Sequence, residues 1–595
     1  MSYGVGCLSP STAKQLTENY SYHPAGALTG KQLQVVVTAT NVFSGQQVPA
    51  TMTAGVLYGL DSAGNRVTVT DPSSTYPLHY SFDSMNRPNG LTDGTPAGMG
   101  QTVLVQNVVY DFAGRMTSMQ YPAFGAIGGQ SSIPYTTESM SYNVNGQLNS
   151  LGWSSPVSGS YPAGSAPNGT LQYVYTAGVN NGQISQVVDS ISGETIVYQY
   201  DSLKRLTSAS STPNAGSSVA GWTQTYQFDG FGNLTGKVLN GTSTAIGVNA
   251  ATNQLSNAGY DANGNMVSGA GVTMVYDEAN RIGSATPVSG GTEYYGYAPD
   301  NKRVYRRKAN GVEEWTLYGA GGEKLVVFAA AGTTSNAVYG VYVADVSIVS
   351  RSVWFAGKLI FEGYPAAQSN PVMSGVYQDR LGTNRAGGAR YLPFGEELTA
   401  TAGDRVKFGT YTRDSFTGLN YADQRYYASG YGRFNSPDPY RASGGPKDPS
   451  SWNRYSYVGA DPVNFSDPSD LAKCKAVGTD TTHRNPDDAL AEQTYAEIQC
   501  TSAGGLITVF GGWQQVTGST DQLVKEWESG VSKDIDDAEF SADLSSAEQI
   551  AEQSLTQCSS QVFPGLSGSG ANSPLSILKS LAKGRPIPVR KKGPL

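Results

Sequence analysis

The feature that most constrains the fold of this chain is a short pattern that recurs from about residue 20 to residue 358. Each copy has an aromatic residue, usually Asp, two variable residues, Gly, then Asn or Arg, and an aliphatic residue. A pattern that returns along several hundred residues indicates a repeat assembly rather than a set of independent domains. Copies begin at Tyr22, Leu60, Tyr110, Tyr142, Tyr200, Phe228, Tyr260, Tyr276 and Tyr297.

Each copy has the residues of a β-hairpin turn. The aromatic residue ends one strand, the Asp side chain accepts hydrogen bonds from the backbone ahead of it, and Gly or Asn takes the positive φ of the turn. A single hairpin cannot bury its own apolar face, so neighbouring copies must stack. We therefore predict that the repeated Tyr and Asp residues serve turns and packing and have no chemical role.

Composition supports a β protein and excludes several kinds of partner. The chain has 72 glycines and 37 tyrosines among 595 residues, and only 14% of its residues are charged, which favours strands and turns over surface helices. Its net charge of −8 provides no attraction for nucleic acid or anionic lipid. The sequence shows neither an 18-residue apolar run nor a signal peptide, so we expect a soluble chain without a membrane span.

Cysteine and histidine are too sparse for most metal and catalytic sites. The four cysteines cannot form a disulfide framework, although one bridge is open among Cys474, Cys500 and Cys558. Their spacing matches no zinc site, and three scattered histidines do not suggest a Ser-His-Asp triad. We predict no metal and no cofactor.

A second, non-repetitive series of motifs lies between residues 377 and 471, and we expect a Tyr-rich strand within it from Asn453 to Val458. This series resembles the Rhs repeat-associated core of the Rhs/YD-repeat family, which includes the C components of Tc insecticidal toxins, polymorphic toxins and, more remotely, the teneurins. The motifs are Tyr377 to Gly382 (YQDRLG), Tyr391 to Glu396 (YLPFGE), Phe416 to Tyr421 (FTGLNY), Arg425-Tyr426-Tyr427, Gly432-Arg433-Phe434, Ser436 to Pro439 (SPDP), Asp461 to Asn464 and Asp467-Pro468.

The resemblance implies a mainly β fold in which the YD-repeat hairpins spiral into a hollow shell, followed by a small α+β C-terminal domain. On this basis we expect an N-terminal segment at 1–19 and the repeat shell at 20–370. The repeat-associated core would occupy 371–471, and a variable C-terminal domain 472–595.

The resemblance also implies an aspartic-type autoprotease, with Asp438 and Asp467 as the catalytic carboxylates and cleavage after Leu471. Two carboxylates held close together share one proton, so one can act as a base and the other as an acid. Arg425 would keep one of them ionised and oriented.

The chain departs from the family pattern at two places. Asp470 stands where the pattern has glycine, and residues 441–451 lengthen the spacing between the two carboxylates. A second explanation of both aspartates is open, namely that they only begin turns. Other Asp-Pro pairs occur in the same chain, at Asp71, Asp448 and Asp461.

The repeat pattern is absent after Leu471. Asn485 and the following Pro-Asp-Asp predict a helix that runs to about Ile498. Residues 506–510 predict a strand, and the capping box at 545–548 predicts a second helix towards Cys558. Residues 521–552 are strongly acidic, whereas 579–595 are basic and are expected to form a solvated terminus.

The main functional hypothesis is an Rhs-type shell protein that encloses its C-terminal domain and releases it by self-cleavage. In the family this domain carries the activity, which is often toxic. Its partners would then be the enclosed domain, an immunity protein and a component of a secretion system, and the protein would be secreted or associated with the cell surface.

Two other hypotheses remain open. The first is a non-enzymatic extracellular or cell-surface protein that binds carbohydrate or protein through its loops. In that case Trp153 and Trp222 could stack on sugars, although cross-strand packing is their more usual role. The second is a truncated, inactive Rhs fragment whose shell does not close.

Overall fold

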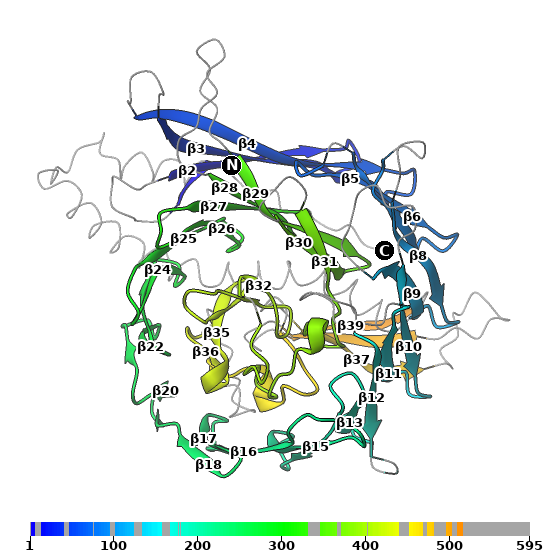
Figure 1. Cartoon of the computed structure of the whole chain (residues 1–595), viewed down its shortest axis with the longest axis vertical. Helices are drawn as coiled ribbons and strands as arrows, with labels where there is room; N and C mark the ends of the chain where they lie inside the picture. The colour runs from blue at the N-terminus through cyan, green and yellow to red at the C-terminus, as the bar shows by residue number, and fades with distance from the viewer. Residues whose placement is uncertain are drawn as a thin grey trace, which may run out of the picture. The chain divides into compact units, whose positions relative to one another are not determined.

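The computed structural model describes residues 2–5, 14–40, 47–74, 76–95, 102–123, 134–156, 167–176, 178, 180–330, 346–365, 371–401, 403–438, 452–467, 473–480, 495–501 and 508–515 (Figure 1). The chain divides into two compact units, residues 1–536 and 537–595, and all of the described residues belong to the first. Among them no helix has the length and apolar character needed to cross a membrane.

The largest sheet has 18 strands, and each pairs antiparallel with the next strand in sequence, so the sheet is one long meander. Its strands are β1 (Ser2–Val5), β2 (Lys14–Tyr22), β3 (Leu28–Thr40), β4 (Gln47–Leu60), β5 (Arg66–Thr70), β6 (Leu78–Phe82), β7 (Pro88–Thr92), β8 (Val103–Tyr110), β9 (Met116–Pro122), β10 (Tyr135–Tyr142), β11 (Leu148–Ser154), β12 (Gly169–Tyr175), β13 (Ile184–Asp189), β14 (Glu194–Tyr200), β15 (Leu206–Pro213), β16 (Trp222–Phe228), β17 (Leu234–Leu239) and β18 (Thr242–Ala245).

A second meander of 11 strands follows a two-stranded hairpin made of β19 (Val248–Asn249) and β20 (Gln254–Leu255). Its strands are β21 (Gly259–Tyr260), β22 (Met266–Gly269), β23 (Val272–Tyr276), β24 (Ile282–Pro287), β25 (Glu293–Tyr297), β26 (Arg303–Arg307), β27 (Glu313–Tyr318), β28 (Lys324–Ala330), β29 (Val346–Phe355), β30 (Lys358–Pro365) and β31 (Pro371–Gly375).

The chain from residue 376 to residue 467, called the core segment below, has little regular structure. It holds a five-stranded sheet of very short strands and three described 3-10 helices. These elements are η2 (Ala386–Gly388), β32 (Arg405–Val406), β33 (Thr412–Arg413), β34 (Asn420–Ala422), β35 (Arg425–Ala428), η3 (Ser429–Tyr431), β36 (Arg433–Phe434) and η6 (Val458–Ala460).

The predicted hairpin turns are present. After Tyr110 closes β8, one carboxylate oxygen of Asp111 accepts hydrogen bonds from the backbone N–H groups of Ala113 (3.0 Å) and Arg115 (2.9 Å). Gly114 has a φ of 75°, which glycine adopts without steric cost, and Met116 begins β9. The register shifts beside each repeated aromatic residue, as between Ser141 and Tyr142, so every repeat carries the same β-bulge.

The core segment packs against strands of both meanders (Figure 1). One continuous apolar cluster contains Trp153 of β11, Tyr226 of β16 and Tyr295 of β25 together with residues of the core segment. The segment contributes a group of rings called the aromatic cluster below, in which the centroids of Tyr427 and Tyr457 are 4.6 Å apart. Its members are Phe408, Tyr411, Tyr427, Phe434 and Tyr457.

The described part of the tail is a three-stranded antiparallel sheet of β37 (Lys473–Asp480), β38 (Tyr495–Thr501) and β39 (Thr508–Gln515). The prediction that a helix runs to about Ile498 is wrong at its C-terminal end, because Tyr495 to Ile498 lie in β38. Tyr, Ile and Thr in this stretch favour a strand. The strand expected at 506–510 exists but begins at Thr508, and the helix expected at 545–558 lies outside the described residues.

Candidate functional site

The candidate site begins with the hairpin of β35 and β36. The two strands pair with Tyr427 opposite Phe434, and η3 connects them. The connection ends at Gly432, whose φ of 62° is in the left-handed region. A Cβ on Gly432 would also lie 2.9 Å from the Phe394 ring, so this position requires glycine for two reasons.

Asp438 lies four residues after the end of β36, beyond a bend at Asn435 and Ser436. The backbone N–H of Phe434 donates to the carbonyl of Tyr455 (3.0 Å), and the N–H of Asp438 donates to the carbonyl of Arg454 (2.8 Å). The Arg454 guanidinium donates in return to the carbonyl of Asp438. Asp438 is buried, so its carboxylate is held in a low-dielectric environment by a fixed backbone.

The structure brings Arg425 and Asp438 together. The Arg425 guanidinium donates to the same Arg454 carbonyl oxygen that accepts from the Asp438 N–H, at 3.2 Å. It also lies 3.8 Å from the centroid of Phe434, a stacking contact that fixes the plane of the guanidinium. Arg425 is buried like Asp438. Arg425 and the backbone of Asp438 thus share one carbonyl acceptor, and the role predicted for Arg425 towards the carboxylate stays a prediction.

Two further arginines, Arg433 and Arg454, lie at this site and were not predicted as site residues from the sequence. Arg433 is buried, donates to the carbonyl of Asn253 and lies 4.5 Å from the centroid of Tyr455. Burial lowers the pKa of Arg433. Arg454 makes the contacts with Asp438 described above. The only signal for these arginines was the Arg-aromatic dipeptide in which each occurs, at Arg433-Phe434 and Arg454-Tyr455.

Asp467 is fixed by a different contact. The hydroxyl of Tyr411, in the aromatic cluster, donates to the backbone carbonyl of Asp467 at 2.6 Å. Burial, and then the negative charge of Asp467, raise the pKa of the neighbouring Tyr457 hydroxyl. The backbone of Asp467 is thus anchored on the aromatic cluster that also contains Phe434, the ring on which Arg425 stacks.

The turn that leads to Asp467 is anchored on the first meander. The Asn464 side-chain amide donates to both oxygens of Asp461 (2.9 and 3.0 Å), and its oxygen accepts from the N–H of Ile184 in β13 (2.9 Å). Arg380 donates to the carbonyl of Val463. Burial raises the pKa of Asp461 above its usual range. Asp461 is therefore a turn residue here, in agreement with the structural role of Asp-Pro pairs.

The Tyr-rich strand expected from Asn453 to Val458 is not formed. This stretch is a series of turns with a single bridge from Ser456 to Arg433. The side-chain oxygen of Asn453 accepts from the N–H of Tyr455 (3.2 Å), and Val458 has a φ of 44°, so local turns replace the strand. Residues 439–451 and 468–472, including Asp470 and the expected cleavage position Leu471, lie outside the described residues.

The tryptophans considered for sugar stacking are buried packing residues. Trp153 donates its indole N–H to Glu138 at 2.8 Å, and Trp222 donates to Glu194 at 3.1 Å. Their exposed fractions are 2% and 4%. Neither ring is accessible to a carbohydrate.

Comparison with solved structures identifies the fold. Neither a model of a known protein family nor the sequence of a curated protein matches the chain. The crystal structure of TcdB2-TccC3-Cdc42 is similar over 78% of this chain, with a TM-score of 0.58 and 19% identity. The structure of the Photorhabdus luminescens Tc holotoxin pore with a TccC3 mutation is similar over 85% of this chain, with a TM-score of 0.58 and 17% identity. The crystal structure of TcdB2-TccC3 has a TM-score of 0.54 and 18% identity over 77% of this chain.

This likeness shows a Tc toxin-like, Rhs-type β-shell fold. The chain spans about a quarter of the length of the solved chains that it matches, since each match covers 24% of the solved chain.

Proposed function

We propose that the chain is an Rhs-type shell protein that cuts itself after Leu471 and so frees residues 472–595. The expected parts are the repeat shell at 20–370, the core at 371–471 and the variable domain at 472–595. The observation that carries the proposal is the shared Arg454 carbonyl, which holds Arg425 and Asp438 side by side in a buried site. In this proposal the positive charge of Arg425 favours the ionised form of Asp438, which then serves as one half of an acid/base pair of carboxylates.

In this mechanism Asp438 and Asp467 divide the work on the peptide bond that follows Leu471. The ionised carboxylate takes a proton from a water molecule, which attacks the carbonyl carbon, and the protonated carboxylate gives its proton to the leaving amine. Arg425 is a positioning residue that keeps its neighbour ionised. The low-dielectric surroundings strengthen each of these interactions.

Self-cleavage is tested on a denaturing gel of the freshly purified full chain. The 62.6 kDa chain should give fragments of about 50 and 13 kDa, in proportion to the lengths of the two parts. Asp438→Asn and Asp467→Asn should each abolish cutting, because neither carboxylate can do the work of both. Arg425→Ala should slow cutting, and Asp470→Gly should accelerate it by restoring the glycine of the family pattern.

The matched control is Asp448→Asn, which changes an Asp-Pro pair lying between the two candidates and should leave cutting unchanged. A single intact band for both the wild type and Asp470→Gly would reject the proposal. Asp438 and Asp467 would then be turn residues.

Enclosure of the freed domain is the second part of the proposal. It is supported by the likeness to Tc toxin complexes, and it implies an exported protein with an immunity protein as a further partner. If the shell encloses residues 472–595, the two fragments should elute together on size-exclusion chromatography after cleavage and separate only in denaturant. Separate elution under native conditions would reject enclosure while leaving self-cleavage intact.

A further inference from the structure

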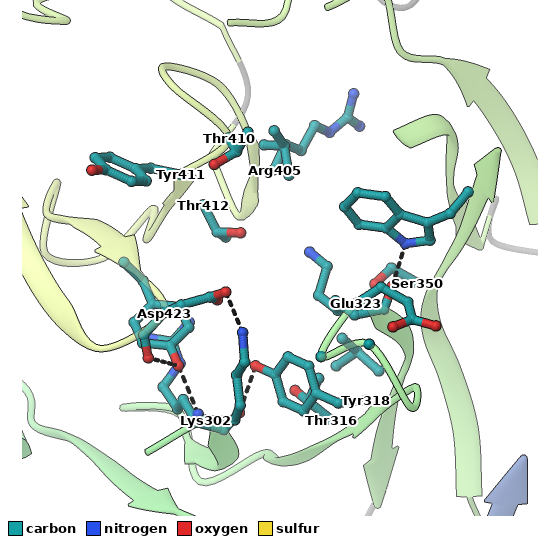
Figure 2. A pocket seen from close by; sticks show the side chains of 18 of the residues that line it. Lys302, Thr316, Tyr318, Glu323, Ser350, Arg405, Thr410, Tyr411, Thr412 and Asp423 are labelled. Atoms are coloured by element: carbon teal, nitrogen blue, oxygen red, sulfur yellow. Dashed lines mark hydrogen bonds and ion pairs between the residues drawn. The ribbon is translucent and has the colours of Figure 1, made fainter. Parts of the chain in front are cut away.

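A cavity of about 930 Å³ lies where hairpins of both meanders face loops of the core segment. Its walls come from β4 to β7, from β26 to β29 with the turn at 356–357, and from residues 403–412 and 421–423. Figure 2 shows Glu323 and Ser350 on one side of it, Lys302 with Asp423 on another, and Thr410 to Thr412 facing them. The volume is that of a site for a small organic ligand. Of these residues, Tyr411 alone also belongs to the self-cleavage site described above, where its hydroxyl donates to the carbonyl of Asp467.

Three of the four carboxylates that line the cavity already have cationic partners. Glu314 pairs with Lys308 at 2.5 Å, Asp404 pairs with Arg306 at 2.8 Å, and Asp423 pairs with Lys302. The fourth is Glu323, whose carboxylate makes no hydrogen bond or ion pair with any residue in the described part of the chain. Glu323 is half-buried, so water hydrates its charge only partly and does not fully substitute for a counter-ion.

The turn that carries Glu323 is held rigidly by aromatic side chains. The Ala320 N–H donates to the Tyr58 hydroxyl at 2.8 Å, and the Trp354 indole donates to the Lys324 carbonyl at 2.9 Å. Tyr80 in turn donates to the carbonyl of Trp354 at 2.9 Å. Tyr58 and Trp354 therefore hold the turn from residue 319 to residue 324, Tyr80 holds Trp354, and all three rings line the cavity.

The negative charge of Glu323 affects the pKa values of the two tyrosines of this wall. Burial, and then the Glu323 carboxylate, raise the pKa of the Tyr58 hydroxyl to about 12, and the pKa of Tyr80 is raised by the same two causes. The position of the carboxylate depends on Gly319, since a Cβ there would lie 2.2 Å from a carboxylate oxygen of Glu323. Glycine at residue 319 thus leaves the space that the carboxylate occupies.

We propose that this cavity binds a small molecule carrying an organic ammonium group, with Glu323 as the counter-ion and Tyr58, Tyr80 and Trp354 as the aromatic wall. An ammonium group is attracted both by a carboxylate and by the faces of aromatic rings. Five of the basic residues that line the cavity, Lys302, Arg303, Arg306, Lys308 and Lys324, are neutralised by carboxylates. Two further basic residues, Arg66 and Arg405, also line the cavity. Arg66 lies 5.1 Å from the centroid of Tyr58 and is a cation that competes for the aromatic wall.

Isothermal titration calorimetry on the full chain tests the proposal, with choline, spermidine and glucosamine as probes. We expect saturable binding of at least one probe at constant ionic strength. Binding of choline alone would indicate a quaternary ammonium ligand, and binding of spermidine or glucosamine would indicate a primary amine. The Asp438→Asn chain serves as the background, so that the result does not depend on self-cleavage.

Two variants test the role of the carboxylate. Glu323→Gln should weaken binding at least tenfold, and Gly319→Ala should weaken it similarly because the added methyl group displaces the carboxylate while keeping its charge. Arg66→Gln should strengthen binding severalfold by removing the competing cation. The control Glu278→Gln, at an exposed turn, should change nothing. Failure of all three probes to bind, or unchanged affinity in Glu323→Gln, would overturn the proposal.

Discussion

The repeated Tyr and Asp residues stabilise the shell through hydrogen bonds that differ greatly in the sequence separation of their partners. Each Asp bonds backbone groups two and four residues ahead, so its role could be predicted from the pattern alone. Four of the repeated Tyr residues, Tyr110, Tyr142, Tyr200 and Tyr297, instead donate their hydroxyls to a carbonyl of the preceding hairpin, as Tyr142 does to Met116 (3.0 Å) and Tyr297 to Ile282 (2.9 Å). These partners are 26 and 15 residues away, and the strand register that brings them together is not visible in the spacing of the repeats.

The buried pair of Arg303 and Asp414 links the second meander to the core segment. The guanidinium makes two bonds to the carboxylate, at 2.6 and 2.9 Å, and a third to the Tyr426 hydroxyl at 2.7 Å. Asp414 is completely buried. Asp414→Asn should lower the free energy of unfolding by about 3 to 5 kcal/mol, because it leaves a buried guanidinium without its counter-ion. Urea unfolding of the two proteins measures the difference.

The control for Asp414→Asn is Arg115→Gln, which breaks a pair near the surface. Arg115 and Asp111 are 2.6 Å apart, and their side chains are 21% and 23% exposed. Solvent screens such a pair, so this substitution should cost only about 1 kcal/mol. Equal losses in the two variants would show that burial does not govern the strength of these pairs.

At the scale of elements, the hairpins were predictable and the core segment was not. Turn residues mark the ends of the strands in both meanders, and the strands begin and end where these residues indicate, as at Tyr200 and Leu206. In the core segment the same residue types serve contacts with distant strands. Asn453, for example, donates to Asn233 at 2.9 Å, and Tyr455 donates to the carbonyl of Gly264 at 2.7 Å. A local pattern cannot reveal such partners, which explains why a strand was wrongly predicted there.

The hairpin turn at Asp201 allows the contribution of one turn to be measured. Its carboxylate accepts from the N–H groups of Leu203 and Arg205, both at 2.9 Å. Asp201→Ala removes both acceptors and should destabilise the protein by about 1 to 3 kcal/mol. The chain itself supplies the conservative variant, because Asn143 makes the same two bonds at the corresponding turn, at 2.9 and 3.0 Å.

Asp201→Asn should therefore lose only the partly exposed ion pair with Arg205, which amounts to about 1 kcal/mol. The midpoint of thermal unfolding distinguishes the two substitutions. An Asn variant as unstable as the Ala variant would show that the charge, and not the turn geometry, is what the repeated aspartate contributes.

At the scale of the described molecule, the core segment is joined to the meanders by buried ion pairs. In each pair one partner lies on a repeat strand or turn and the other on the core segment, and at least one of the two is largely inaccessible to solvent. The pairs are Arg303 with Asp414, Arg306 with Asp404, Asp189 with Arg385 and Glu194 with Arg390. The resemblance to a known family implied a shell and a core, but only the structure shows that each supplies the other's counter-ions.

The repeat strands should consequently be unable to fold without the core segment. A chain of residues 1–370 would leave Asp189, Glu194 and Arg303 without the ionic partners that the core segment supplies, and each buried charge that loses its counter-ion costs about 3 to 5 kcal/mol. Their sum rivals the whole stability of a typical domain, which is about 5 to 15 kcal/mol. We expect residues 1–471 to give a native near-ultraviolet circular dichroism spectrum and a cooperative thermal transition, and residues 1–370 to give neither. A monomeric 1–370 chain that unfolds cooperatively would contradict this interdependence and would identify the repeat strands as an independent domain.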